Sequence, residues 1–365
     1  MIESLSRIKR SVQRAGSVRN LLLMLISFAL SVTFTRIFLN LTGFPKIASG
    51  NFHLAHVLWG GLILYIAAVI PLLFANRWVY SFSAIFSGIG MGLFIDEVGK
   101  FITSTNDYFY PPAAPIIYSF FLIATILYSQ VKKKKPADDR SALYHAFDLM
   151  EEVLEHELDH EERAELISTL TSIRTRSKDP DYRRLSDELL HFVESESVAT
   201  ITKRQYFTDK VGYFIQRTRD KYFTERIIYY TIMVSMVSLA IYLFVYPARF
   251  FLSIDSVENM GLVMEPYIRA NLLTPTSGLD WLTARVILEG IIAFILFLAG
   301  ILLLFQKKKL GMALSYLGMI LVITVLNMLI FYYDQFSTIG FAVIQLGILL
   351  LVLYYRNHFL NASPG

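Results

Sequence analysis

Two pairs of ionisable residues occur at matching positions in the apolar N-terminal part of the chain. His53 and His56 stand at the start of one apolar run, and Asp96 and Glu97 stand near the end of the next. Two imidazoles and two carboxylates suit zinc or another divalent metal. Alternatively, a histidine and a carboxylate share a proton and act as general base and acid. Both interpretations make these four residues the candidate catalytic site, and the first makes them metal ligands.

Four further charged residues are candidates for binding. Arg36, in the first apolar run, suits an anionic group such as a phosphate, and Lys100 follows the carboxylate pair. Asp107 lies in the loop beyond, at the rim of the predicted site. Glu289 follows Arg285 by four residues in a later run, which makes the two neighbours on one helical face. The alternatives are an ion-pair network that only fixes helix packing, or side chains that reach the lipid headgroups.

Glycine spacing indicates how the carboxylates are positioned. Gly88, Gly92 and Asp96 are four residues apart, so they share one face of a helix. A G-x-x-x-G face packs closely against another helix in a membrane, and we therefore expect Asp96 to face a neighbouring helix. A similar stripe in the preceding run comprises His53, His56 and Gly60.

These stripes belong to apolar runs that are long enough to cross a bilayer. The chain is 55% hydrophobic and only 18% charged, whereas soluble domains are about 25% charged. About eight runs reach the length of roughly 18 residues that a transmembrane helix needs. They cover residues 20–42, 52–75, 78–103, 112–131, 226–247, 281–305, 311–333 and 337–356. The predicted fold is an all-α, polytopic membrane helix bundle with a cytoplasmic helical insert.

Basic residues beside the runs predict the orientation. Arg77, Lys132 to Lys135, Lys307 to Lys309 and Arg356 all fall on one side when eight spans are threaded, and such residues favour the cytoplasm. Both termini are therefore expected in the cytoplasm, with the candidate site facing outward from the inner (plasma) membrane. The net charge of +4 reflects these flanks, which meet anionic lipid and do not indicate a nucleic-acid partner.

Carboxylates concentrate in the middle of the chain, where twenty of the thirty fall between Asp138 and Glu225. This pattern predicts an N-terminal membrane half at 1–135, a cytoplasmic helical domain at 136–225 and a C-terminal membrane half at 226–365. Apolar residues at helical spacing predict which faces of the middle domain point inward. These residues are Leu143, Phe147, Met150, Val153 and Leu154 in a first helix and Leu185, Leu189, Leu190 and Phe192 in a third.

The middle domain contains a match to H-E-x-x-H, from His156 to His160. In a zinc peptidase this spacing places two imidazoles on one helical face, so the match requires an unbroken helix. Asp159 is followed three residues later by Glu162, a capping-box pattern that predicts the start of a new helix. The break would separate the two histidines, and we interpret the match as coincidental.

Several motifs together carry a resemblance to known proteins. They are His56-Val57-Leu58-Trp59-Gly60-Gly61, Gly92-Leu93-Phe94-Ile95-Asp96-Glu97-Val98-Gly99-Lys100-Phe101 and Asn106-Asp107-Tyr108-Phe109. Over its first four spans the chain resembles an uncharacterised family of bacterial multi-pass membrane proteins, which implies a bacterial inner-membrane location. It is distantly similar to the VanZ-like membrane proteins, although Lys100 stands where that pattern has a glutamine. No glycopeptide-resistance role is carried over.

The residues favour a membrane-embedded hydrolase or transferase, either metal-dependent or acid–base, acting on a lipid or envelope precursor. One alternative is a transporter for an ion or small solute, and another is a sensor that signals through the cytoplasmic helical domain. A transporter needs a polar path to the inner side, and the inner halves of the spans hold few ionisable residues. The lipid bilayer is an expected partner under every alternative.

Overall fold

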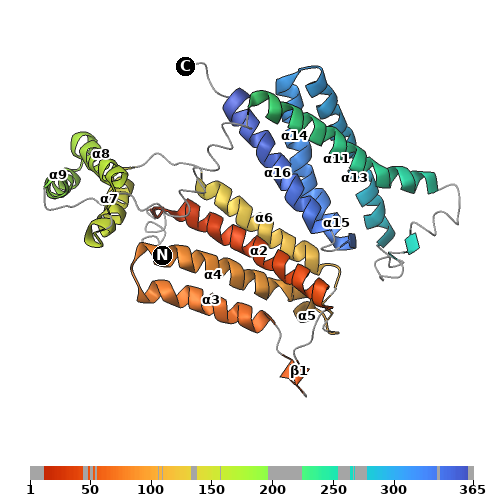
Figure 1. The fold of residues 1–365 in the computed structure, drawn as a ribbon, viewed down its shortest axis with the longest axis horizontal. Coiled ribbons are helices and arrows are strands. Elements are labelled where there is room, and N and C mark those ends of the chain that lie inside the picture. The colour runs from red at the N-terminus through yellow and green to blue at the C-terminus, as the bar shows by residue number, and fades with distance from the viewer. Residues whose placement is uncertain are drawn as a thin grey trace, which may run out of the picture. The chain divides into compact units, whose positions relative to one another are not determined.

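The computed structural model is an all-helical membrane bundle, as predicted (Figure 1). It describes residues 12–43, 48–49, 52–53, 56–105, 107–108, 110–132, 138–156, 158–195, 224–253, 264–265, 267, 278–334 and 338–360. Eight helices in this part of the chain are long and apolar enough to cross a membrane. They are α2 (Ser17–Thr42), α3 (His56–Leu73), α4 (Arg77–Asp96), α6 (Ala113–Lys132), α11 (Glu225–Ser253), α13 (Gly278–Leu304), the series α14 (Lys308–Leu321), η1 (Val322–Leu326) and α15 (Asn327–Asp334), and α16 (Ile339–Tyr355) with η3 (Arg356–Leu360).

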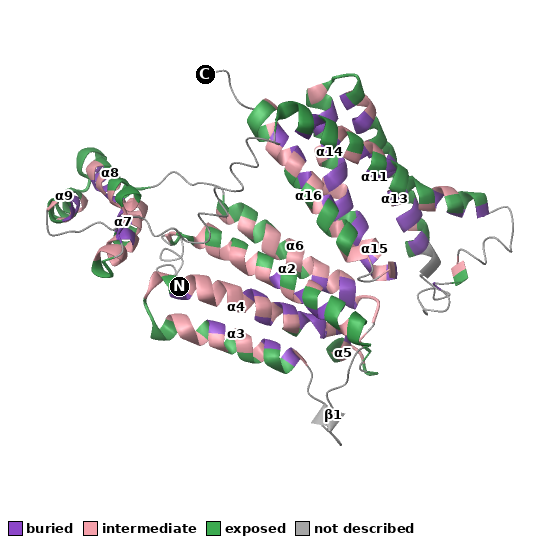
Figure 2. Ribbon diagram, in the orientation of Figure 1, coloured by how far each residue is buried: buried purple, intermediate pink, exposed green. Residues whose placement is uncertain are grey.

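Exposed positions recur along these helices (Figure 2), and many of them carry large apolar side chains. Leu41 of α2 and Leu72 of α3 are each 82% exposed, and Phe34 is 72% exposed. Soluble monomers rarely leave large contiguous apolar surfaces uncovered. The exposed faces therefore indicate a lipid bilayer as the surrounding medium.

The chain forms two compact units. The first comprises Met1–Phe94 and Ile123–Val211, so it holds α2, α3 and most of α4 together with the helices of the middle domain. The second comprises Ile95–Leu122 and Gly212–Gly365, so it holds the C-terminal spans and the connection from α4 to α6.

Close helix packing in the first unit depends on the glycines of α4. A Cβ atom on Gly88 would lie 2.3 Å from the backbone oxygen of Met24 in α2. A Cβ atom on Gly92 would lie 2.6 Å from the Cβ of Ser31 in the same helix. These separations are too short for a side chain, which confirms the predicted close-packing face.

The glycine pair of α3 provides a matched test of this packing. We expect Gly60→Ala to destabilise the protein by about 1–3 kcal/mol, because its Cβ would lie 2.7 Å from the backbone nitrogen of Phe94 and 2.8 Å from the backbone oxygen of Gly90. Gly61→Ala is the control, since a Cβ there meets nothing within 4 Å. Denaturant unfolding in detergent micelles, followed by circular dichroism, measures both. Equal stability of the two variants would contradict the prediction.

The middle domain contains three helices, α7 (Asp139–Leu154), α8 (His160–Arg176) and α9 (Pro180–Glu194). They pack around a small apolar core that comprises Ala146, Leu149, Leu166, Leu170, Leu190 and Val193. The small side chains of Ala146 and Val193 are buried where the helices meet. The buried faces of α7 and α9 therefore differ in part from those predicted.

Part of the predicted inward face of this domain is therefore wrong. Phe147 and Leu154 of α7 are 47% and 78% exposed, and Leu185 and Phe192 of α9 are 38% and 47% exposed. The periodic pattern predicted that these large residues are buried because they are apolar. In the structure, smaller residues one position away, such as Ala146 and Val193, pack in the core instead. Leu143, which was also predicted to face inward, is buried.

The H-E-x-x-H segment is broken, as the capping pattern predicted. Helix α7 ends at Leu154, and His156 has a left-handed backbone with φ of 57°. The Asp159 carboxylate accepts the backbone N–H of Glu162 at 2.8 Å, and the Glu162 carboxylate accepts the backbone N–H of Asp159 at 3.2 Å. Helix α8 then begins at His160, so the two histidines do not share one helix.

Glu151 of α7 makes the stability of this domain depend on pH. Burial raises its pKa above the ordinary value of 4.5, and the nearby Asp148 carboxylate raises it further, while Arg14 and Arg77 oppose the shift. The folded state then holds this proton more tightly than the unfolded chain. The corresponding stability is present below the unfolded pKa and is lost as the pH rises through the raised, folded-state pKa.

We therefore expect Glu151→Gln to raise the Tm at neutral pH and to leave it unchanged at about pH 3, where both states are protonated. Thermal melts of the full chain at several pH values, followed by circular dichroism, measure the difference. Glu188→Gln is the control, because Glu188 is an exposed carboxylate of the same domain. A Tm difference that does not grow with pH would contradict the assignment to Glu151.

The second unit is centred on α11, α13, α14 and α16, whose buried side chains form one apolar core. Asn327 donates to the Gln345 side-chain oxygen at 2.8 Å, a polar contact of the kind that holds membrane helices together. Tyr118 of α6 donates to the backbone oxygen of Ile323 in the π-helical segment η1 at 2.6 Å. This contact anchors the start of α6 in the unit.

Candidate functional site

Both predicted carboxylates lie where α4 breaks. We expected one helix through residue 103, but α4 ends at Asp96. Glu97 then occupies the N-cap position of the short helix α5 (Val98–Ile102), without a side-chain capping hydrogen bond. The prediction of one continuous helix is wrong, because the loop that follows α5 folds back against Gly99 of that helix. A Cβ atom on Gly99 would lie 2.7 Å from the backbone oxygen of Asp107, so the close return requires a glycine there.

Thr103 fixes the returning loop. Its hydroxyl donates to the backbone oxygen of Gly99 at 2.8 Å and accepts the backbone N–H of Asp107 at 2.8 Å. Asp107 itself is exposed. The loop thus brings the next residue, Tyr108, back to the end of α4.

Four residues form what we call the carboxylate cluster: Asp96, Glu97, Lys100 and Tyr108. Asp96 and Glu97 are both 0% exposed. The Tyr108 hydroxyl donates to Asp96 Oδ2 at 2.5 Å, and the Lys100 ammonium pairs with Glu97. Lys100 Nζ also lies 5.3 Å from the centroid of the Tyr108 ring. Each buried carboxylate therefore has a titratable donor of its own.

The carboxylate cluster has the groups that proton transfer needs. A carboxylate takes a proton as a general base, and a hydrogen-bonded phenol passes one on. Lys100 compensates the negative charge of Glu97, which would otherwise be costly to bury. The predicted ion pair between Lys100 and a carboxylate is therefore formed, with Glu97 as its partner.

The two histidines are placed differently from the predicted stripe. His56 is the half-buried first residue of α3. His53 lies in strand β2 (Phe52–His53), opposite Ala48 of β1 (Ala48–Ser49), and its side chain is outside the described residues. The expectation that the two histidines share one helical face is wrong, because α3 begins only at His56.

The metal site stays a prediction. Among the described side chains, which do not include that of His53, no group of three or more His, Asp or Glu residues is placed to hold a metal ion. Arg36 of α2 is buried, with 9% of its surface exposed. A shared site of Arg36 or His56 with the carboxylate cluster also stays a prediction.

A second buried set, the arginine cluster, comprises Arg285, Glu289, Asp334, Tyr246 and Tyr333. Arg285 Nε donates to Glu289 Oε1 at 3.0 Å, which confirms the predicted pair, and Nη2 donates to Asp334 Oδ2 at 2.7 Å. The guanidinium carbon lies 4.9 Å from the Tyr246 ring centroid and 5.5 Å from that of Tyr333. Arg285 and Glu289, both on α13, are 5% and 3% exposed, so their ion pair is desolvated. The second ion pair, between Arg285 and Asp334, joins α13 to α15.

Sequence reasoning did not assign Tyr108 of the carboxylate cluster, nor Asp334, Tyr246 and Tyr333 of the arginine cluster. Tyr108 was visible beside Asp107, but only the folded loop aims its hydroxyl at Asp96. Asp334 ends the seventh span, and a carboxylate inside an apolar run was the signal that could have singled it out. Its partner Arg285 is 49 residues away in sequence, so no local spacing connects the two.

Comparisons with protein-family models, curated proteins and solved structures give no match for this chain. The fold and the two clusters define the class: a polytopic helical membrane protein with buried charged sites in its second unit. The function is therefore argued from the chemistry of these residues.

Proposed function

We propose that this protein is a membrane-embedded enzyme that hydrolyses or transfers a group of a lipid or envelope precursor, with the carboxylate cluster as its acid–base site. The observation that carries the proposal is the hydrogen bond of 2.5 Å between Tyr108 and the fully buried Asp96. A buried carboxylate is costly to retain, and ionisable residues within membrane spans commonly mark functional sites.

The proposed step is attack of a hydroxyl group or water on an ester or phosphoester centre. Asp96 takes the proton of the attacking oxygen while the new bond to that oxygen forms. The bond to the leaving oxygen breaks, and that oxygen takes the hydroxyl proton of Tyr108. Asp96 then returns its proton to the Tyr108 oxygen along their hydrogen bond, which restores both groups. The Lys100–Glu97 pair lies in the first turn of α5, next to Asp96, and neutralises the second buried carboxylate during this exchange.

Lipid turnover by the purified full chain tests the proposal. Proteoliposomes made from a total bacterial lipid extract are incubated, and lipid classes are followed by mass spectrometry, with and without a chelator. We expect the wild type to consume one class and to form its cleavage or transfer product, and the Asp96→Asn variant to lose this activity. Inhibition by the chelator would assign a metal-dependent reaction. Turnover that is unchanged by Asp96→Asn would overturn the proposed site.

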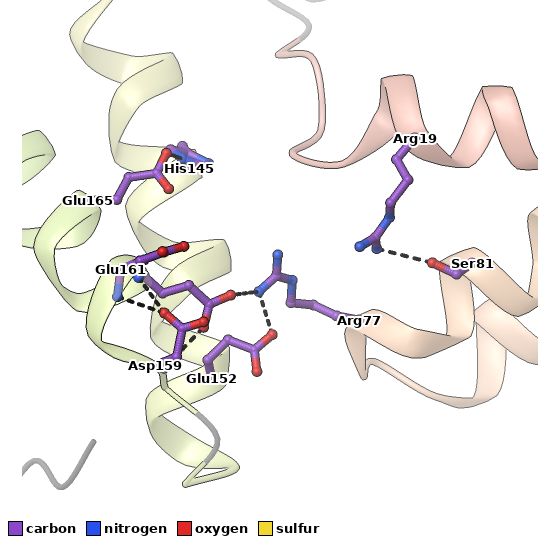
Figure 3. Close-up of polar contacts among 9 residues, drawn as sticks. Arg19, Arg77, Ser81, His145, Glu152, Asp159, Glu161 and Glu165 are labelled. Carbon is purple, nitrogen blue, oxygen red and sulfur yellow. Dashed lines mark hydrogen bonds and ion pairs between the residues drawn. The ribbon is translucent and has the colours of Figure 1, made fainter. Parts of the chain in front are cut away.

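One observation favours the sensor as a second candidate. In the first unit, Arg77 at the start of α4 pairs with Glu152 of α7 (Figure 3). Asn76 donates to the Glu155 carboxylate at 2.8 Å. These contacts connect a membrane span directly to the middle domain. In the same assay, a sensor predicts that the wild type turns over no lipid, which separates the two candidates.

A further inference from the structure

A polar pocket lies where α2 and α4 begin, within the first unit. It is a small pocket that is partly open to solvent. Its lining combines three arginines with two polar side chains and one carboxylate, and comprises Arg14, Ala15, Gly16, Arg19, Asn20, Arg77, Tyr80 and Asp148. Cations thus outnumber anions in the lining by three to one.

Neighbouring side chains hold each arginine in the pocket. The Arg14 guanidinium lies 3.4 Å from the centroid of the Tyr80 ring. Arg19 donates to the Ser81 hydroxyl at 3.1 Å (Figure 3). Ser81 in turn donates to Asn20 at 3.1 Å. Aromatic and hydroxyl groups therefore orient Arg14 and Arg19. None of these groups carries a negative charge, so these contacts do not neutralise the two guanidinium groups.

Carboxylates of the middle domain neutralise only part of this charge. Arg77 pairs with Glu152 and lies 3.6 Å from Glu162. Asp148 accepts the backbone N–H of Ala15 at 3.2 Å. Within the described residues, no carboxylate forms an ion pair with Arg14 or Arg19, although Glu151 is near enough to Arg14 for its pKa to respond. Two guanidinium groups thus remain available to an anion.

We infer that this pocket binds the phosphate group of an anionic phospholipid. Guanidinium groups match phosphate oxygens with paired, charge-assisted hydrogen bonds. Two membrane spans begin at the pocket, so it lies at the depth of the headgroups and beside the lipid. This position favours a lipid headgroup over free phosphate, because a lipid is already concentrated there. Basic pockets between spans commonly bind anionic headgroups.

Lipid binding to the full-length protein in detergent tests the inference. The protein is titrated with phosphatidylglycerol or phosphatidylcholine, and bound lipid is counted by native mass spectrometry. We expect the wild type to prefer phosphatidylglycerol, and Arg14→Gln with Arg19→Gln to weaken that binding about 30-fold, since each basic residue near the surface contributes a factor of about five. Arg14→Lys with Arg19→Lys keeps the charge but loses the paired donors, so it should weaken binding by an intermediate factor.

A control double variant, Lys132→Gln with Arg356→Gln, removes the same charge from the ends of two other spans, and its binding should stay close to that of the wild type. Equal weakening in the control and pocket variants would overturn the site in favour of diffuse charge. Equal binding of the two lipids by the wild type would also overturn it.

Inorganic phosphate should displace phosphatidylglycerol only weakly. Binding of phosphate without binding of the lipid would assign the pocket to free phosphate instead. If the glutamine variant does not fold, the lysine variant decides: binding unchanged from the wild type would overturn the role of the guanidinium groups.

Discussion

Replacing Asp96 with asparagine is expected to reduce lipid turnover by about 10²–10⁴-fold, the range that general acid–base catalysis supplies. Asparagine has nearly the same size and still accepts the Tyr108 hydroxyl through its amide oxygen, but it cannot take up a proton. Because Asp96 is fully buried, a change of shape there would disturb packing, whereas this change preserves it. The rate of lipid consumption by proteoliposomes, with equal amounts of folded protein, measures the effect.

Two further variants separate catalysis from packing at this site. Tyr108→Phe removes the hydroxyl that donates to Asp96 and is expected to reduce turnover as well. Ser104→Ala changes an exposed residue of the same loop and should leave turnover unchanged. Gel filtration and circular dichroism report the folded state of each variant. Loss of folded protein in Asp96→Asn would contradict the prediction and would show that the carboxylate only fixes helix packing.

Replacing Arg285 with leucine is expected to destabilise the protein by about 3–5 kcal/mol, the usual effect of breaking a buried ion pair from one side. The variant would leave the Glu289 carboxylate, with a side chain only 4% exposed, without its cation. Asp334 would lose the same partner but is 30% exposed and retains some access to solvent. Arg285 thus neutralises two carboxylates on different helices. Denaturant unfolding in detergent measures the loss.

A double-mutant cycle tests whether the loss arises from the unpaired charge. Arg285→Leu with Glu289→Leu removes both charges, so it should be more stable than Arg285→Leu alone. Arg356→Leu is the control, because Arg356 is half-buried at the end of α16 and forms no ion pair with a carboxylate of the described residues; its guanidinium carbon lies 4.4 Å from the centroid of the Tyr316 ring. A double variant that is less stable than Arg285→Leu would contradict this account and would indicate that the side chains act mainly through packing.

Local physics made several features readable in the sequence alone. The spans follow from the length of apolar runs, because a helix in lipid must satisfy its own backbone hydrogen bonds. The break before α8 follows from the reciprocal bonds of Asp159 and Glu162. The pair of Arg285 with Glu289 follows from helical spacing, as does the stripe through Gly88. Each of these depends on residues within a turn or two of one another.

The composition of both clusters was decided by tertiary structure. The end of α4 at Asp96 depends on a loop that returns past Gly99, and Tyr108 reaches Asp96 only through that loop. Asp334 meets Arg285 across 49 residues, and the inward face of α7 was set by packing against Leu166 and Leu170 of α8 and Leu190 and Val193 of α9. Such contacts join residues that are distant in sequence, so no periodic pattern encodes them. The sequence by itself determined the eight apolar spans, the break before α8 and the glycine face of α4. The folded chain decided where α4 ends and which buried charges became partners, because each charge takes the partner that packing brings within hydrogen-bond distance.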